Sequence, residues 1–263
     1  MTYQRGSWFR SYVPRPAART RLFCFPYGGG AASAFNGWAE ELPDSVDLVA
    51  VQYPGRQDRF NDPSPAGIPE LAEEIVRVIG SGFDMPTAFF GHSMGGVVAY
   101  EVARRLQPRF PSPLALLMVS ACRTPAGRHR EGLRFEEDEM RGYIQSLGGS
   151  GAKSLDDDDV WELAHPVIRN DLGWTETYRY APGAPLTCPI VALAGDRDPA
   201  ATPQDIELWK NYTIAGATTH VLSGGHFYFE DSLPRLASVL AGELAAVSAS
   251  AAPAPSEPTG NRP

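Results

Sequence analysis

Hydrophobic positions fall into six short runs, separated by longer stretches in which apolar residues recur every three or four positions. The runs are almost continuously apolar, as is typical of strands that are buried on both faces of a sheet. We therefore predict six β-strands, with room for a helix between most neighbours. The predicted strands are Arg21–Pro26, Asp47–Tyr53, Thr87–Phe90, Leu114–Ala121, Ile190–Ala194 and Thr218–Leu222.

The stretches between the runs have helical periodicity. In Pro69–Ile79, for example, Leu71, Ile75 and Val78 fall on one face of a helix. Strands that alternate with helices predict an α/β fold, in which helices flank a mostly parallel sheet. The other predicted helices are Phe35–Leu42, Met94–Leu106, Asp205–Tyr212 and Asp231–Val247.

One connection is too long to be a simple loop. Residues 123–188 lie between two predicted strands, whereas connections beyond about 12–15 residues without their own structure are uncommon. Two helical stretches, Glu136–Leu147 and Asp159–Tyr178, flank the glycine-rich segment Gly148–Gly151. We interpret this region as a helical lid with a hinge. The acidic run Asp156–Asp159 is interpreted as a first helical turn, where acidic side chains complement the helix dipole.

These patterns divide the chain into three parts. Residues 1–122 and 189–247 are predicted to form an α/β core, into which residues 123–188 insert as the helical lid. Residues 248–263 consist mainly of alanine, serine and proline without a strand or helix period, so we predict a disordered tail.

Composition narrows the function classes. The 263-residue chain has 23 basic and 31 acidic residues, a formal net charge of −8, whereas a non-specific nucleic-acid binder is expected to be basic. No apolar run has the roughly 20 residues that cross a bilayer, and no secretory signal is visible. The three cysteines lie in apolar runs. We predict buried free thiols, a cytoplasmic protein, and neither nucleic-acid nor membrane partners.

The first candidate for chemistry is the segment Gly91-His-Ser-Met-Gly-Gly96. The Gly-x-Ser-x-Gly pattern alone is weak, but here it follows an apolar run and precedes an unbroken helical stretch. That arrangement is typical of a nucleophile elbow, in which flanking glycines clear the backbone around a strained serine. We predict that Ser93 is a nucleophile at the carboxyl edge of the sheet, where open parallel sheets place their ligands.

A serine nucleophile needs a base. Among the five histidines, His226 follows the last predicted strand and therefore reaches the same edge as Ser93. His220 lies within that strand and is the main alternative, whereas His92 is adjacent to the serine and too constrained to reach it. The remaining histidines, both in the predicted lid, are His129 and His165.

A third group must orient the imidazole ring. The strand Ile190–Ala194 runs into Gly195-Asp-Arg-Asp-Pro199, which brings an acid to the same edge. Asp196 comes first and is placed to serve the turn, because aspartate readily bonds nearby backbone. Asp198 lies deeper in the loop, with better reach toward His226. Both remain candidates, and either gives the chain order Ser, Asp, His that is described for α/β-hydrolases.

A glycine-rich loop follows the first predicted strand in Phe25-Pro-Tyr-Gly-Gly-Gly30. Its backbone N–H groups are candidates for an oxyanion hole, together with the N–H of Met94. No Gly-Lys-Ser/Thr follows, so the segment does not fit a phosphate-binding loop.

With these residues placed, the chain resembles the type II thioesterases of the α/β-hydrolase superfamily. These are discrete editing enzymes that accompany polyketide and non-ribosomal peptide synthases. The resemblance spans residues 21–244, nearly the whole predicted globular part. The motifs that carry it are Phe25–Gly30, Gln52–Arg59, Gly91–Gly96, Thr177–Gly183, Gly195–Asp198 and Gly224–Phe227.

The resemblance assigns roles to individual residues. It implies Ser93 as the nucleophile, His226 as the base and Asp198 as the orienting acid. Gly28 and Met94 match the backbone oxyanion donors of the family. Residue 28 is a glycine where alanine is more usual in the family, and this change preserves the backbone N–H.

The resemblance also implies a reaction and a partner. The expected reaction is hydrolysis of acyl thioesters from the phosphopantetheine arm of an acyl or peptidyl carrier protein, without a metal or organic cofactor. We expect a monomer. The alternatives are a small-ester esterase or lipase of the same fold, a cyclising thioesterase, and a non-catalytic carrier-binding module. The arginines available to face an acidic carrier are Arg56, Arg59, Arg104, Arg105 and Arg109.

Overall fold

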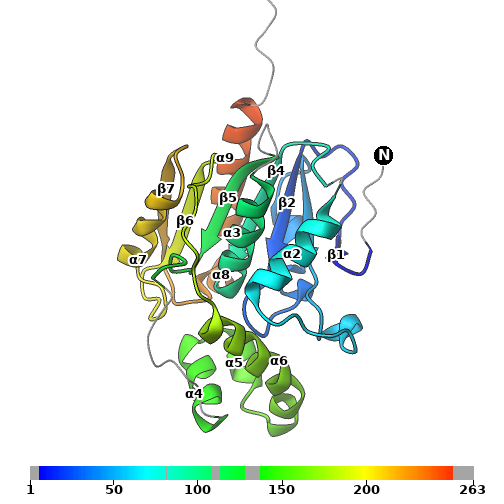
Figure 1. Ribbon diagram of the computed structural model, residues 1–263, viewed down its shortest axis with the longest axis vertical. Coiled ribbons are helices and arrows are strands. Elements are labelled where there is room, and N and C mark those ends of the chain that lie inside the picture. Colours follow the sequence, from blue (N-terminus) through cyan, green and yellow to red (C-terminus); the bar gives the residue numbers. More distant parts are fainter. Residues whose placement is uncertain (1–5, 81, 108–112, 128–136, 251–263) are drawn as a thin grey trace, which may run out of the picture.

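The computed structural model describes residues 6–80, 82–107, 113–127 and 137–250, and within them one sheet holds the strands in the order β1-β3-β2-β4-β5-β6-β7 (Figure 1). All neighbours pair in parallel except β1, which is antiparallel to β3. The six predicted strands are the parallel ones, so the predicted α/β fold is confirmed. The strands are β1 (Phe9–Arg10), β2 (Thr20–Phe25), β3 (Val46–Val51), β4 (Thr87–His92), β5 (Leu114–Ser120), β6 (Ile190–Gly195) and β7 (Ala217–Leu222).

Burial separates the central strands from the edge strand. Every residue of β2, β3, β4 and β6 is buried, which explains their continuous apolar runs. Strand β7, at the end of the sheet, is mostly exposed and has three consecutive polar residues, Thr218, Thr219 and His220. Cys24, Cys122 and Cys188 are buried and free, as predicted.

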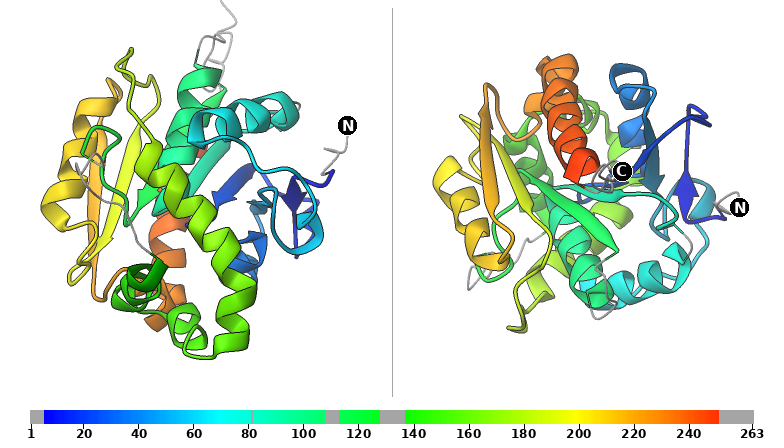
Figure 2. Two further views of the ribbon diagram at one scale, coloured as in Figure 1. Left: turned by 60° about the horizontal axis from the view of Figure 1, so that its bottom comes forward. Right: turned by 90° about the horizontal axis from the view of Figure 1, so that it is seen from above.

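Helices cover both faces of the sheet (Figure 2). The helices α2 (Ile68–Ile79) and α3 (Met94–Leu106) pack with α7 (Pro203–Glu207) in the core of one face. On the other face, α1 (Trp38–Glu41), α8 (Tyr228–Asp231) and α9 (Leu233–Ser250) form a second core. Because helices cover both faces of the sheet, a site can form only at the ends of the strands.

Three predicted helices are broken by local residues. The predicted Phe35–Leu42 is a 3-10 turn, Ala32–Phe35, followed by α1, because Gly37 between them adopts a φ of 82°. The predicted Asp205–Tyr212 is divided between α7 and a 3-10 turn, Leu208–Tyr212. The predicted Asp231–Val247 starts inside α8, and α9 begins at Leu233.

The segment 123–188 carries α4 (Glu137–Leu147), α5 (Ser150–Ser154) and α6 (Asp158–Thr177), which lie beyond the carboxyl ends of the strands (Figure 1). Gly148 and Gly149 separate α4 from α5 with φ values of 75° and 86°. Asp157 caps α6 by accepting hydrogen bonds from Asp159 N and Val160 N, at 2.9 and 3.2 Å. The interpretation of the acidic run as a helix start is confirmed.

The C-terminal helix runs further than predicted. We placed the start of the tail at residue 248, but α9 continues to Ser250. The rest of the predicted tail, 251–263, lies outside the described residues. In the part of the chain that the structure describes, no helix has the length and apolar character needed to cross a membrane.

Candidate active site

The turn between β4 and α3 has the geometry of a nucleophile elbow. Ser93 is the residue between the strand and the helix, and it holds φ 54° and ψ −116°, a strained conformation for a residue with a side chain. A Cβ on Gly91 would overlap the backbone of Gly95, and a Cβ on Gly95 would overlap the carbonyl of Phe25. Both glycines are therefore required by close backbone approach, as the sequence predicted.

The structure brings Asp198 and His226 together from two loops at the same sheet edge. Nδ1 of His226 lies 2.9 Å from Oδ2 of Asp198. Both residues are buried, with 2% and 3% of their surfaces exposed. The other carboxylate oxygen accepts the N–H of Ala200 at 2.8 Å, which fixes the carboxylate. This pair holds the imidazole with Nδ1 protonated and leaves Nε2 as the basic nitrogen.

Asp196 has a different environment. Its Oδ1 accepts the N–H of Gly224 at 2.8 Å, and its side chain is 44% exposed. That bond joins the loop after β6 to the loop after β7, where a Cβ on Gly195 would overlap the backbone of Gly225. Asp196 thus fastens the turn, while Asp198 contacts His226.

The other histidines lie away from this pair or are held in place. Nε2 of His220 lies 2.7 Å from Oε1 of Glu243, at the edge strand. His92 is fully buried, and its Nδ1 lies 2.9 Å from the hydroxyl of Ser120. Burial lowers the pKa of His92 well below its ordinary value, and the adjacent His226 lowers it further. His165 packs on Trp161 of α6, and His129 lies outside the described residues.

The glycine loop after β2 lies beside the elbow. The N–H of Gly29 donates to Asp171 Oδ2 at 2.7 Å, and the N–H of Gly30 donates to Tyr27 O at 2.9 Å. These two amides are therefore engaged. Gly28 and Met94 both line the cavity, and their N–H groups stay the predicted oxyanion donors. A Cβ on Gly28 would make only ordinary contacts, at 3.7 Å from Asp171 Cβ and 4.0 Å from Met94 Sδ, so alanine fits there as well.

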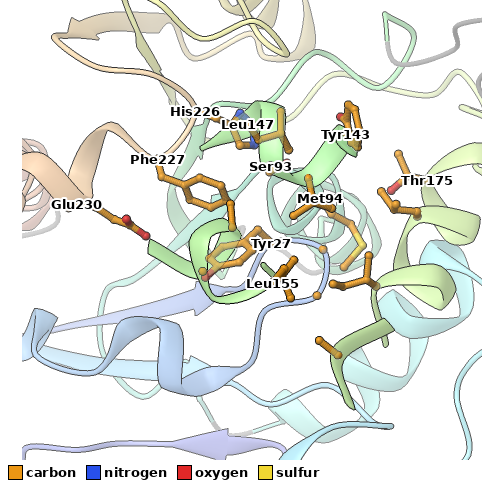
Figure 3. Close-up of a pocket in the computed structure, with 18 residues that line it drawn as sticks. Tyr27, Ser93, Met94, Tyr143, Leu147, Leu155, Thr175, His226, Phe227 and Glu230 are labelled. Atoms are coloured by element: carbon orange, nitrogen blue, oxygen red, sulfur yellow. The ribbon is translucent and has the colours of Figure 1, made fainter. Parts of the chain in front are cut away.

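A cavity of about 240 Å³ opens over Ser93 and His226, beneath the helices of the segment 123–188 (Figure 3). Its lining is mainly apolar. A second cavity, of about 150 Å³, shares Ser93 and His226 and extends toward Arg123. Ser93 thus lies where two cavities meet. The first cavity is lined by Tyr27, Gly28, Gly29, Ser93, Met94, Tyr143, Ile144, Leu147, Gly151, Ala152, Leu155, Ala164, Ile168, Leu172, Thr175, His226, Phe227 and Glu230.

Two of the arginines that we considered for carrier contact are buried instead. Arg56 is 4% exposed and pairs with Asp171. Arg59 is 6% exposed and pairs with Asp62, with its guanidinium over the ring of Trp8. Neither is available to a carrier protein. Arg104 and Arg105 pair with Glu101, and Arg109 lies outside the described residues.

Sequence reasoning did not find Asp171, Tyr27 or Glu230 as parts of the site. Asp171 is a single acid within a long helical stretch, and nothing in its neighbourhood distinguishes it. Tyr27 lies inside the glycine-rich motif Phe25–Gly30, and this position is the sequence feature that could have indicated its place in the site. Glu230 follows His226 by four residues, and only the short helix α8 turns it toward the cavity.

A mostly parallel sheet with helices on both faces and a serine elbow at its carboxyl edge defines an α/β-hydrolase. The sequence matches the thioesterase domain family over residues 20–244, and the chain belongs to that family. It is therefore a hydrolase that acts on thioester bonds.

Individual relatives agree with this assignment. Thioesterase PikA5 of Streptomyces venezuelae is 40% identical over 228 residues, which cover 86% of this chain and 81% of that protein. The solved structure of BorB, a type II thioesterase from the borrelidin biosynthetic cluster, is similar with a TM-score of 0.83 and 34% identity, covering 92% of this chain and all of that one. RedJ, a thioesterase of the prodiginine pathway in Streptomyces coelicolor, has a TM-score of 0.79 and 37% identity, covering 88% of each chain.

Proposed function

We propose that this thioesterase is an editing enzyme, which hydrolyses acyl groups from the phosphopantetheine arm of acyl or peptidyl carrier proteins in polyketide or non-ribosomal peptide biosynthesis. The observation that carries the proposal is the Asp198–His226 pair beside Ser93, at the floor of an apolar cavity. BorB, a type II thioesterase from the borrelidin biosynthetic cluster, and YbtT, a type II thioesterase from the yersiniabactin NRPS/PKS biosynthetic pathway, are structural relatives and support the same substrate class.

The proposed catalytic groups act together in the first half of the reaction. His226 removes the proton from Ser93, whose oxygen attacks the thioester carbonyl, and Asp198 stabilises the resulting imidazolium. The N–H groups of Gly28 and Met94 bind the oxyanion, a contribution typically worth about 10²–10³ in rate for each donor. Met94 is the first residue of α3, so its N–H is not used within the helix.

The second half of the reaction returns the enzyme to its starting state. The carrier thiolate leaves as the carbon–sulfur bond breaks, and it takes the proton from His226. The acyl group is then an ester of Ser93. A water molecule, deprotonated by His226, attacks this ester, and the free acid leaves as Ser93 regains its proton.

We propose that the two cavities divide the substrate between them. The larger, mainly apolar cavity takes the acyl group, and the smaller one takes the pantetheine end of the arm. At about 240 Å³, the acyl cavity is below the range of about 300–1,000 Å³ that is common for drug-sized ligands. The proposal therefore favours short acyl groups while the lid, residues 123–188, remains closed.

We also propose that the enzyme is a cytoplasmic monomer, in keeping with three free buried cysteines. Light scattering of the purified chain measures its mass directly. A dimer at micromolar concentration would contradict this part of the proposal.

Replacement Ser93→Ala tests the proposed function. We expect at least a 10³-fold loss of thioester hydrolysis on a carrier-bound acyl group, because the nucleophile is absent, with a melting temperature close to that of the parent. A fluorophosphonate probe should label the parent at Ser93 and leave the variant unlabelled. Residual activity within tenfold of the parent would exclude Ser93 as the nucleophile.

The same preparation separates the alternatives. An editing thioesterase should hydrolyse carrier-bound thioesters with higher kcat/KM than nitrophenyl esters of the same acyl group. A preference for the nitrophenyl esters would indicate a small-ester esterase. Absence of both probe labelling and turnover in the parent would indicate a non-catalytic binding module.

A further inference from the structure

A buried ion pair joins the lid to the core beside the cavity. Nη1 and Nη2 of Arg56, in the loop after β3, each donate to one carboxylate oxygen of Asp171 on α6, both at 2.8 Å. The Arg56 side chain is 4% exposed and that of Asp171 is fully buried. Two parallel bonds of this kind fix both the distance and the orientation of the partners.

The same pair holds the glycine loop of the site. Asp171 Oδ2 accepts the N–H of Gly29 at 2.7 Å, and Nη1 of Arg56 donates to Gly30 O at 2.8 Å. The contact is also sterically close, because a Cβ on Gly29 would lie 2.9 Å from Cγ1 of Ile168 on α6. The loop backbone next to Gly28 is therefore fixed by one carboxylate and one guanidinium.

We propose that Asp171 and Arg56 are positioning residues for the oxyanion hole: they fix the glycine loop so that the N–H of Gly28 points at the developing oxyanion. This inference rests on the proposed function, because it takes Gly28 as an oxyanion donor. An oxyanion donor acts only when it lies about 2.7–3.1 Å from the oxyanion, so a small shift of the loop removes its effect. Since Asp171 belongs to α6, the donor is aligned only when this lid helix is seated.

The proposal gives a role to the motif Gln52–Arg59, which the proposed chemistry leaves unused. The Tyr53 hydroxyl donates to Pro26 O at 3.3 Å, before the glycines, and Gln52 Oε1 accepts the N–H of Ala32 at 2.7 Å, after them. Arg56 holds the middle of the loop. One short motif thus supports the glycine loop at its start, centre and end.

Stability alone is a weak reason for such a pair. Removing two charges from water costs free energy that their attraction often fails to return, so apolar residues of similar volume frequently serve as well. The pair instead provides one acceptor, for the N–H of Gly29, and one donor, to the carbonyl of Gly30. We therefore attribute its presence to the position of the loop.

The test uses two variants that avoid an unpaired buried charge. The double variant Arg56→Met/Asp171→Leu replaces both partners by apolar residues and removes both loop contacts. Arg56→Lys keeps a positive charge beside Asp171 and the bond from Gly29 to Asp171. We expect kcat on a carrier-bound thioester to fall at least tenfold in the double variant and about threefold in Arg56→Lys, with KM changed less than threefold in both.

A matched control removes a different bond between the lid and the core. Nε1 of Trp174, also on α6, donates to Pro65 O at 3.0 Å, which lies outside the glycine loop. Trp174→Phe should lower the melting temperature and leave kcat within twofold of the parent. If Trp174→Phe loses as much kcat as the double variant, or if the double variant keeps kcat within twofold, the inference is wrong.

A transition-state analogue separates this inference from the proposed function. A short alkyl trifluoromethyl ketone adds to a nucleophilic serine and places an oxyanion in the hole. Its affinity should fall at least tenfold in the double variant, in parallel with kcat/KM, and be lost in Ser93→Ala. Equal affinity in parent and double variant would overturn the inference alone, whereas unchanged affinity in Ser93→Ala would overturn the proposed function itself.

Discussion

The floor and the roof of the main cavity are built differently. The floor is the carboxyl edge of the sheet, where the elbow rests on close backbone contacts and the Asp198–His226 pair is buried. The roof is the segment 123–188, which has a small apolar cluster of its own around Met140 and Leu155. The contrast places the groups proposed for chemistry on the part with the large apolar cores. Access to them is left to the part with the small apolar cluster.

The roof itself is attached unevenly. Toward its C-terminal end, α6 is held by buried bonds from Asp171 and Trp174 to the core, and Tyr178, the residue after the helix, donates to Glu101. The start of α5 is held by Ser150, whose N–H and hydroxyl donate to Glu230 at 2.6 and 3.1 Å on the exposed surface. Exposed contacts of this kind contribute little stability. We therefore expect α4 and α5 to move while α6 remains seated.

The largest effect is predicted for a change in the Asp198–His226 pair, at the floor of the cavity. Asp198→Asn should lower turnover by about 10⁴, because the amide no longer holds the imidazole in the required tautomer. Its melting temperature should stay near that of the parent. Asp196→Asn is the matched control, because it alters a carboxylate in the same loop that bonds Gly224 instead of His226.

The control variant should behave in the opposite way. Asp196→Asn should keep most of its turnover and lose roughly 0.5–2 kcal/mol of stability, by analogy with the loss of a helix cap. Steady-state kinetics and thermal unfolding of both variants check this prediction. If the two phenotypes are exchanged, Asp196 is the orienting acid and our assignment is wrong.

A smaller effect is predicted when the movement of α5, in the roof, is restricted. In the variant Ser150→Cys/Glu230→Cys, a short reversible bifunctional thiol reagent should join α5 to α8. We expect turnover on carrier-bound thioesters to fall about tenfold, because the arm needs a moving lid, while small esters slow less than twofold. The native cysteines are buried and should not react.

Reduction of the cross-link provides the control for this experiment. Turnover on the carrier-bound substrate should return to that of the untreated variant. Equal slowing of both substrate types would show that the reagent damages the site. No slowing of either would show that α5 does not move during turnover.

The smallest predicted effect is a pH dependence of folding stability that arises from the buried His92. His92 is neutral in the folded protein at a pH where it is already protonated in the unfolded chain, because its pKa is lowered by burial and by His226. Below about pH 6.5 the unfolded chain therefore binds the extra proton, and stability falls by up to about 1.4 kcal/mol per pH unit from this group. The contribution is constant above that pH.

The variant His92→Asn isolates this contribution, because asparagine can still bond Ser120 and does not titrate. Denaturant unfolding of both proteins between pH 7 and pH 5 should show the parent losing more stability than the variant as the pH falls. Parallel curves over this range would mean that His92 is not held neutral in the fold.

The elements that the sequence predicted are those with a long, consistent pattern. All six predicted strands and the elbow helix are present, and five of the strands, β2 to β6, are buried and have continuous apolar runs. Strand β1 was missed because two residues, Phe9 and Arg10, are too short to show a period. The helix predicted at Phe35–Leu42 is shortened to α1, Trp38–Glu41, because Gly37 interrupts the pattern of apolar spacing.

The residues of the site divide in the same way, into those that the sequence pattern predicts and those that it does not. Ser93, Asp198 and His226 each follow a predicted strand, so topology alone brought them to one edge. The Arg56–Asp171 pair joins residues 115 positions apart, one in a loop and one in a helix. Its formation depends on how far α6 reaches over the sheet, and a single sequence contains no period that fixes that distance.

The position of α9 has a practical consequence. This helix ends at Ser250 on the side of the molecule opposite α4, α5 and α6, and the N-terminal strand also lies away from those helices (Figure 1). A solid support or a fluorescent protein joined behind α9 would therefore leave the opening above Ser93 facing the solution. Attachment through the C-terminus is thus the natural choice for an immobilised biocatalyst or a surface-based carrier-binding assay.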